Sequence, residues 1–235
     1  MLALLDINAP EAAAKRLAKL GYEVLRLPPH PHLPVPIASH PDMLLFFAPQ
    51  SIICSHSYAR LAKKELRFLS EYAQKELLFT EEEQEPSYPR DVLFNAAPFG
   101  NTLICHRSAT SARVRACYSD LLSVKQGYAK CSILPIAERA LITEDPSIAK
   151  VSAQNGFSVL QISSGQTLLK GYDTGFLGGA SSFSPYREAH EIFFCGNLEA
   201  HSDAGRIKDF CRAHHKEPIS LGDFPLTDVG TIFLI

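Results

Sequence analysis

The hydrophobic and polar positions along this chain follow two periods, one typical of strands and one typical of helices. Short apolar runs, such as 51–55 and 191–196, predict buried strands. Longer segments between them, such as 10–20 and 203–215, place apolar residues three or four positions apart and predict amphipathic helices. Because the two kinds of segment alternate along the chain, the pattern predicts an α/β fold.

The predicted elements repeat in one order: strand, strand, helix, strand. In the clearest copy, Asp145 is the N-cap and Pro146 the first residue of a helix that ends at Gly156. This copy has strands at 128–136, 138–145 and 157–163 around the helix at 146–155. Further copies are expected at 42–47, 51–55, 58–75 and 76–80; at 91–97, 101–106, 108–122 and 123–126; and at 174–183, 191–196, 203–215 and 217–222.

The two ends of the chain together supply the parts of one more copy. The first 27 residues predict a strand at 2–7, a helix at 10–20 and a strand at 22–27, but no first strand. The last strand, 229–235, belongs to no copy. Placing it beside 2–7 completes a fifth unit and closes a ring, so we predict a single-domain, five-bladed α/β propeller of ββαβ units over residues 1–235. An open α/β sheet is the alternative, because alternating strands and helices predict that fold as well.

A closed ring of five ββαβ units resembles the pentein fold of arginine and agmatine deiminases, amidinotransferases and dimethylarginine hydrolases, and of non-catalytic ribosome-binding factors. In the enzymes, a cysteine attacks a guanidinium carbon, a histidine handles protons and acidic residues bind the guanidinium. Segments such as "SHPDM", "YPRD", "VKQGYAKCSI", "GFLGGA" and "DVGTI" also resemble those of bacterial proteins of similar length and unknown function. The resemblance to the pentein enzymes implies an activity. The resemblance to the bacterial proteins supports a shared fold and implies no activity.

The enzyme resemblance assigns roles to residues at the starts of first strands. "SHPDMLLF" offers His40 as the acid/base partner, and "GYAKCSILP" maps Cys131 onto the nucleophile. The cysteine unit lies two units after the histidine unit, as in the deiminases. Those enzymes, however, place their cysteine in the C-terminal strand, and the corresponding strand here has Phe233 and no cysteine. The predicted substrate-binding residues are Asp42, Asp91, Asp173 and Asp228.

Each of these residues also has a purely structural interpretation. A free cysteine is usually a buried core residue, a histidine before proline can cap a turn, and aspartates before strands commonly form turns. Four aspartates at equivalent points of a ring would nevertheless converge on one channel and favour a cationic guanidino or amine ligand. On a regular strand Lys130 and Cys131 would point to opposite faces, so Lys130 is not expected to activate the thiol. The glycines of "GFLGGA" predict close backbone packing or a bulge.

Composition and charge argue against several classes of protein. A net charge of −2 argues against nucleic-acid binding by general electrostatics, and no apolar run has the length of a membrane span. The N-terminus has no basic start and no cleavage-site pattern, so we expect a strand there and not a signal peptide. Six cysteines without C-x-x-C or zinc-type spacing predict reduced thiols in a cytoplasmic protein with no metal and no cofactor. Two hypotheses follow: a guanidine-modifying hydrolase or amidinotransferase acting on a small arginine-like substrate, or a non-catalytic pentein-like protein that binds a ligand or a macromolecule.

Overall fold

The computed structural model describes all 235 residues, and its strands form five small sheets instead of one open sheet. Three sheets are built alike: the first strand pairs antiparallel with the second, which pairs parallel with the third. The α/β class and the strand order of these three copies are therefore confirmed. They consist of β3 (Phe46–Phe47), β4 (Ser51–Ser55) and β5 (Glu76–Thr80); β6 (Ala97–Phe99), β7 (Thr102–Cys105) and β8 (Asp120–Ser123); and β9 (Ile133–Ala137), β10 (Ala140–Thr143) and β11 (Ser158–Gln161).

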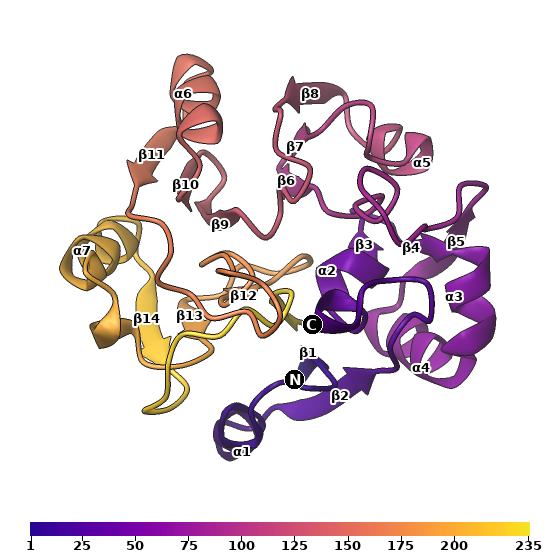
Figure 1. Ribbon diagram of the computed structural model, residues 1–235, viewed down its shortest axis with the longest axis horizontal. Coiled ribbons are helices and arrows are strands. Elements are labelled where there is room, and N and C mark those ends of the chain that lie inside the picture. Colours follow the sequence, from indigo (N-terminus) through magenta and orange to yellow (C-terminus); the bar gives the residue numbers. More distant parts are fainter.

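Helices connect the second and third strands of these sheets. In the best-predicted case, the Asp145 carboxylate accepts the backbone N–H groups of Ser147 and Ile148, Pro146 is the first helical residue, and Gly156 follows with φ +81°. The connecting helices are α3 (His56–Leu61) with α4 (Lys63–Ala73), α5 (Ala112–Arg115) and α6 (Pro146–Gln154). Figure 1 shows these connecting helices at the rim of the molecule and β3, β6, β9 and β12 (Ser182–Phe183) toward its middle.

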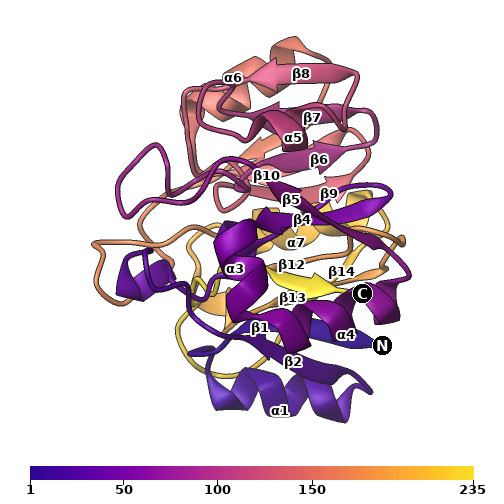
Figure 2. The same cartoon turned by 90° about the vertical axis from the view of Figure 1, so that its right-hand side faces the viewer.

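The two ends of the chain meet in one sheet. The last strand, β15 (Ile232–Leu234), pairs antiparallel with β1 (Leu2–Asp6), with Leu234 opposite Ala3. Helix α1 (Glu11–Lys19) then leads to β2 (Glu23–Leu27), which pairs parallel with β1. Figures 1 and 2 both show the N- and C-termini close together. The predicted pairing of the C-terminal strand with the N-terminal one is confirmed.

The fourth copy departs from the prediction. Strand β12 has only two residues and pairs parallel with β15. Strands β13 (Glu191–Phe194) and β14 (Glu217–Ser220), which α7 (Ala204–Ala213) connects, form a separate two-stranded parallel sheet. A single antiparallel bridge, Ser181 to Phe194, links β12 to β13. The expected long strand over 174–183 is wrong, because Gly178 packs on the backbone of Cys131, where an added Cβ would lie 2.4 Å from the carbonyl oxygen. The strands form no closed barrel.

Other predicted strands and helices are shorter than expected. The apolar run at 42–47 begins as a helical turn, α2 (Pro41–Leu44), because Pro41 has the φ of a first helical residue. Residues 91–94 and 128–132 are turns instead of strands. The helix predicted over 108–122 is only α5, and the expected single helix over 58–75 is divided between α3 and α4. Two short 3-10 turns, η1 (Val35–Ile37) and η2 (Leu198–Ala200), complete the elements, and none of the helices has the length and hydrophobicity needed to cross a membrane.

Candidate functional site

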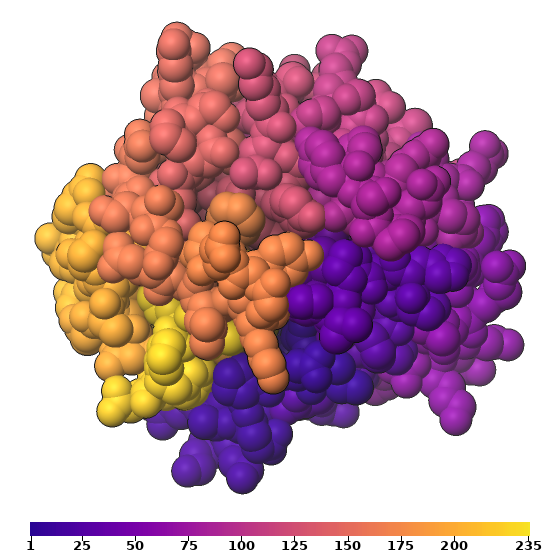
Figure 3. Space-filling model, in the orientation of Figure 1, coloured from indigo at the N-terminus to yellow at the C-terminus, as the bar shows by residue number.

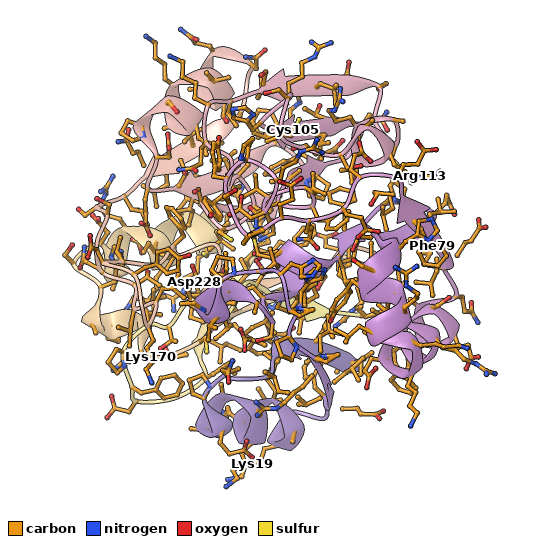
Figure 4. All side chains as sticks on the ribbon, turned by 45° about the vertical axis from the view of Figure 1, so that its right-hand side comes forward. Lys19, Phe79, Cys105, Arg113, Lys170 and Asp228 are labelled. Carbon is orange, nitrogen blue, oxygen red and sulfur yellow. The ribbon has the colours of Figure 1, made fainter.

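A cluster of buried polar side chains lies where the inner strands begin. Asp42 lies in α2 before β3, Asn95 lies before β6, and Cys131 lies in the turn before β9. Asp228 and Thr231 lie just before β15. Figure 4 labels Asp228 in the interior of the molecule. Residues far apart in the sequence thus meet because each precedes an inner strand.

Cys131 is held by two of these neighbours and is only 3% exposed. The Asn95 Nδ2 group donates to its Sγ across 3.1 Å, and the thiol donates to the Asp42 Oδ2 atom across 3.2 Å. The Asn95 Oδ1 atom also accepts the backbone N–H groups of Lys130 and Cys131, at 2.8 and 3.2 Å. Burial raises the pKa of the Cys131 thiol well above its usual value, and the nearby Asp42 charge adds to this shift.

Lys130 points into the same cluster, so the expected alternation of Lys130 and Cys131 is wrong. The two residues lie in a turn, where the period of a strand does not apply. The Lys130 Nζ donates to Thr231 Oγ1 across 2.9 Å, and this hydroxyl donates to Asp42 Oδ2 across 2.8 Å. Burial lowers the pKa of Lys130, and the charge of Asp42 opposes that shift.

His40 lies among carboxylates and makes no hydrogen bond to Cys131. Its Nε2 is 3.5 Å from Asp6 Oδ2, and its Nδ1 is 3.8 Å from Asp228 Oδ1. Burial raises the pKa of Asp228, and the His40 charge opposes this shift. An added Cβ on Gly179 would lie 2.0 Å from Asp228 Oδ1. The close packing predicted for the glycines of "GFLGGA" is confirmed.

The other two predicted aspartates have different surroundings. Asp91 is buried and accepts the hydroxyl of Tyr128, the residue that opens the turn carrying Cys131. Burial and this hydrogen bond raise the pKa of Tyr128. Asp173 is exposed and is not brought into the buried cluster. The structure therefore gathers Asp42 and Asp228 near Cys131, places Asp91 beside its turn, and leaves Asp173 outside.

Glu144 is a further buried acid close to the cluster. It follows β10, and its Oε1 accepts the backbone N–H of Leu177 across 2.9 Å. Burial raises its pKa to about 7, and the Asp228 charge pushes in the same direction. A carboxyl group with such a pKa can hold or release a proton near neutral pH.

Two cavities lie beside the cluster. A small one, of about 10 Å³, is lined by Lys130 and Asp42, and Asp42 Oδ1 accepts no hydrogen bond from the protein. A cleft of about 740 Å³ shares Phe47, Pro98 and Phe183 with the small cavity. The small cavity has room for about one water molecule and not for a guanidinium group. On the face drawn in Figure 3, the orange segment that precedes β12 lies across the middle of the molecule.

Sequence reasoning missed Asn95, Thr231, Asp6 and Glu144. No motif assigned them a role, although Thr231 lies in the quoted segment "DVGTI". Their contacts span long distances in the chain: 36 residues from Asn95 to Cys131 and 189 from Thr231 to Asp42. No group of three or more His, Cys, Asp or Glu side chains is placed to hold a metal ion.

Comparisons with known proteins agree with this architecture. The agmatine deiminase of C. jejuni is a similar solved structure, with a TM-score of 0.55 over 94% of this chain and 87% of that chain, at 7% sequence identity. At this identity the likeness shows the fold alone, a pentein-like α/β fold. No curated protein matches the sequence significantly. A family of unknown function (DUF6873) matches residues 4–233, and the chain therefore belongs to that family.

Proposed function

We propose that the protein is a guanidine-modifying enzyme, of hydrolase or amidinotransferase type, that uses Cys131 as its nucleophile on a small arginine-like substrate. The observation that carries this proposal is the placement of the Cys131 Sγ between the Asp42 carboxylate and the Asn95 amide. A nucleophile within hydrogen-bond reach of a base and of a second orienting group is the usual arrangement for covalent catalysis.

The proposal divides the strands into five blades of a pentein propeller closed by β15: the three regular sheets, the strands β15, β1 and β2, and β12 together with the β13–β14 sheet. The pairing of β15 with β1 and the likeness to agmatine deiminase support this arrangement. In such a ring the starts of the inner strands share one channel. The fourth blade would then be the irregular one, with its first strand reduced to β12.

The chemistry begins with removal of the thiol proton. In this proposal the proton passes from Cys131 to Asp42 Oδ2, and the thiolate attacks the guanidinium carbon. A C–S bond forms, a C–N bond breaks, and the departing amine takes up the proton that Asp42 received from the thiol. Water then cleaves the C–S bond in a hydrolase, or a second amine accepts the amidino group in an amidinotransferase. The substrate cation would favour the thiolate by charge, because an opposite charge nearby favours the ionised form.

The other predicted residues take supporting roles in this proposal. His40 would hold a proton beside Asp228 and act through that carboxylate, because it makes no hydrogen bond to Cys131. Asp42, Asp91 and Asp228 would attract the cation, and a buried carboxylate oxygen without a partner on Asp42 supports this. Asp173 would contribute only if its exposed segment moved toward the substrate.

The 740 Å³ cleft is the proposed route to the site, because it adjoins the small cavity beside Asp42. Phe183 lines both spaces, and its ring centroid is 5.5 Å from the Lys130 Nζ. Since the inner cavity holds no more than about one water molecule, a guanidinium can reach Asp42 only when a wall such as Phe183 moves. The lining of the cleft includes Lys216, which is paired with Glu188, and Glu191. In this proposal they lie near the carboxylate and the amino group of an amino-acid-like substrate.

Turnover of guanidino compounds tests the proposal directly. The protein is incubated with agmatine, arginine and methylated arginines, and ureido products, ammonia and transferred amidino groups are measured by mass spectrometry. We expect one substrate class to be consumed, Cys131 to be modified by 2-chloroacetamidine before the other five cysteines, and both signals to be lost in Cys131→Ser. Turnover that survives Cys131→Ser would rule out this cysteine as the nucleophile.

One observation favours a non-catalytic binding protein as the second candidate. The cluster already contains its own cation, because Lys130 is 2% exposed and is joined to Asp42 through Thr231. A permanently neutralised cluster would have less need of a cationic substrate. This candidate predicts calorimetric binding of an arginine-like ligand or a macromolecule that is unchanged in Cys131→Ser, with no product formed.

A further inference from the structure

Four side chains form one continuous line of hydrogen bonds through the cluster. The Lys130 ammonium donates to Thr231 Oγ1 at 2.9 Å, and Thr231 donates to Asp42 Oδ2 at 2.8 Å. The Cys131 thiol donates to the same Asp42 oxygen at 3.2 Å. Although Lys130 and Cys131 are neighbours in sequence, these hydrogen bonds connect their side chains through two residues from other parts of the chain.

Thr231 has an unusual backbone that fixes its hydroxyl in this line. Its φ is +66°, in the left-handed region that β-branched residues rarely adopt. Gly230 before it has φ +64°, and an added Cβ there would lie 2.2 Å from the Cβ of His40. The Thr231 N–H donates to Gly179 at 2.8 Å, and the Asp42 N–H donates to Gly230 at 3.1 Å. Such strain persists only where surrounding contacts enforce it, and it is common at functional sites.

The direction of each hydrogen bond follows from the chemistry of the donors. A lysine ammonium can only donate, so the Thr231 oxygen accepts from it. The single Thr231 proton can then go to Asp42 Oδ2 at 2.8 Å or to the Gly178 carbonyl at 3.2 Å, and the charged and nearer acceptor is favoured. The ammonium therefore polarises the hydroxyl, and the hydroxyl draws negative charge on Asp42 away from the sulfur.

We propose that Lys130 is a built-in activating cation for Cys131 and that it acts through Thr231 and Asp42. Lys130 and Thr231 are positioning residues in this scheme. In the substrate-free protein, where Asp42 is still ionised, they reduce the repulsion between its carboxylate and a Cys131 thiolate that has lost its proton to solvent. Burial lowers the pKa of Lys130, and the three charged groups around it, Asp42, Cys131 and Asp228, oppose that shift and favour its ammonium form. The proposal deepens the proposed role of Cys131 and rests on it only for the catalytic consequence.

The rate of Cys131 alkylation by iodoacetamide tests this line without any substrate. The reagent captures the thiolate, so its rate at a fixed, mildly alkaline pH follows the thiolate fraction. Peptide mass spectrometry separates Cys131 from the other five cysteines. Amide hydrogen exchange over 128–133 reports whether a variant also changes opening of the turn. The pH profile of each variant then separates ionisation from access.

The variants distinguish a line of contacts from a general effect of charge. We expect Lys130→Met and Thr231→Val each to slow alkylation at least about tenfold, equivalent to one pKa unit or more, while Thr231→Ser keeps the native profile. The double variant should be no slower than Lys130→Met alone, since both changes interrupt one line. If Lys130→Met does not fold, the Thr231→Val and Thr231→Ser pair, which retains Lys130, decides alone.

Two results would overturn the proposal. One is an unchanged alkylation profile in Thr231→Val with unchanged amide exchange. The other is a double variant whose two effects simply add, which would mean that Lys130 acts through space. The expected profile combined with no turnover of any guanidino compound would leave this inference standing and contradict the proposed function. Turnover of a guanidino compound combined with an unchanged alkylation profile in Thr231→Val would support the proposed function and contradict this inference.

Discussion

Replacing Glu144 by glutamine changes the pH dependence of stability by an amount that the structure sets. The pKa of Glu144 is raised from 4.5 to about 7 by burial, while its Oε1 accepts the Leu177 N–H. A shift of about 2.5 units corresponds to about 3 kcal/mol, at 1.36 kcal/mol for each unit. Glutamine keeps the acceptor oxygen and has no charge to bury.

The sign follows from proton linkage. Between pH 4.5 and about 7 the folded protein binds the Glu144 proton more tightly than the unfolded chain does, so this group lowers stability as the pH rises. Its favourable contribution is complete below pH 4.5 and is lost once the pH passes about 7. We therefore expect the stability of Glu144→Gln relative to the native protein to increase as the pH rises from 4.5 to about 7. Above that pH the difference in the free energy of unfolding should reach about 3 kcal/mol.

Thermal unfolding over a series of pH values provides the assay. For a chain of this length, about 3 kcal/mol corresponds to a difference in Tm of about 6–12 °C above neutral pH. Glu76→Gln removes an exposed carboxyl on β5 and serves as the matched control. A difference between Glu144→Gln and native protein that stays constant from pH 4.5 to 7, or a less stable variant above pH 7, would refute the burial argument.

Three further substitutions probe the thiol and its access. In Asp42→Asn, loss of the neighbouring charge should lower the pKa of Cys131 and speed alkylation, while turnover falls because the proposed base is gone. Asn95→Ala should cost about 2–4 kcal/mol in urea unfolding, because two buried backbone N–H groups lose their acceptor. Phe183→Ala should expose the small cavity to the cleft and speed Cys131 alkylation, whereas Tyr172→Ala, at an exposed aromatic outside the cleft lining, should not.

Local chemistry made parts of the fold predictable. The start of α6 depends on Asp145 and Pro146 alone, so it could be recognised from two adjacent residues. The β15–β1 pairing was inferred from an unassigned strand at one end and a missing one at the other. The run at 42–47 was not predictable in this way, because an uninterrupted apolar segment fits a buried strand and a buried helical turn equally well.

The candidate site could be predicted only in part, because its geometry depends on distant contacts. His40, Asp42, Cys131 and Asp228 were found because the enzyme resemblance assigned roles to residues near the starts of predicted strands, and all four are buried. The orientation of Lys130 was mispredicted because the turn that carries it is held by Asn95, 35 residues earlier. No local pattern encodes that contact. The left-handed backbone of Thr231 likewise depends on Gly179 and cannot be recognised from "DVGTI" alone.

The composition of the interior changes where the inner strands begin. Each sheet packs apolar residues against its neighbours and helices, and these clusters account for the core. A fold stabilised by packing alone would extend such residues to its middle, because an unpartnered buried polar atom costs about 1–3 kcal/mol. Instead the starts of the inner strands deliver a thiol, an ammonium and several carboxylates, with unpartnered oxygens on Asp42 and Asp91. Since proteins tolerate such costs mainly at functional sites, this contrast supports the proposal that the cluster is the functional site.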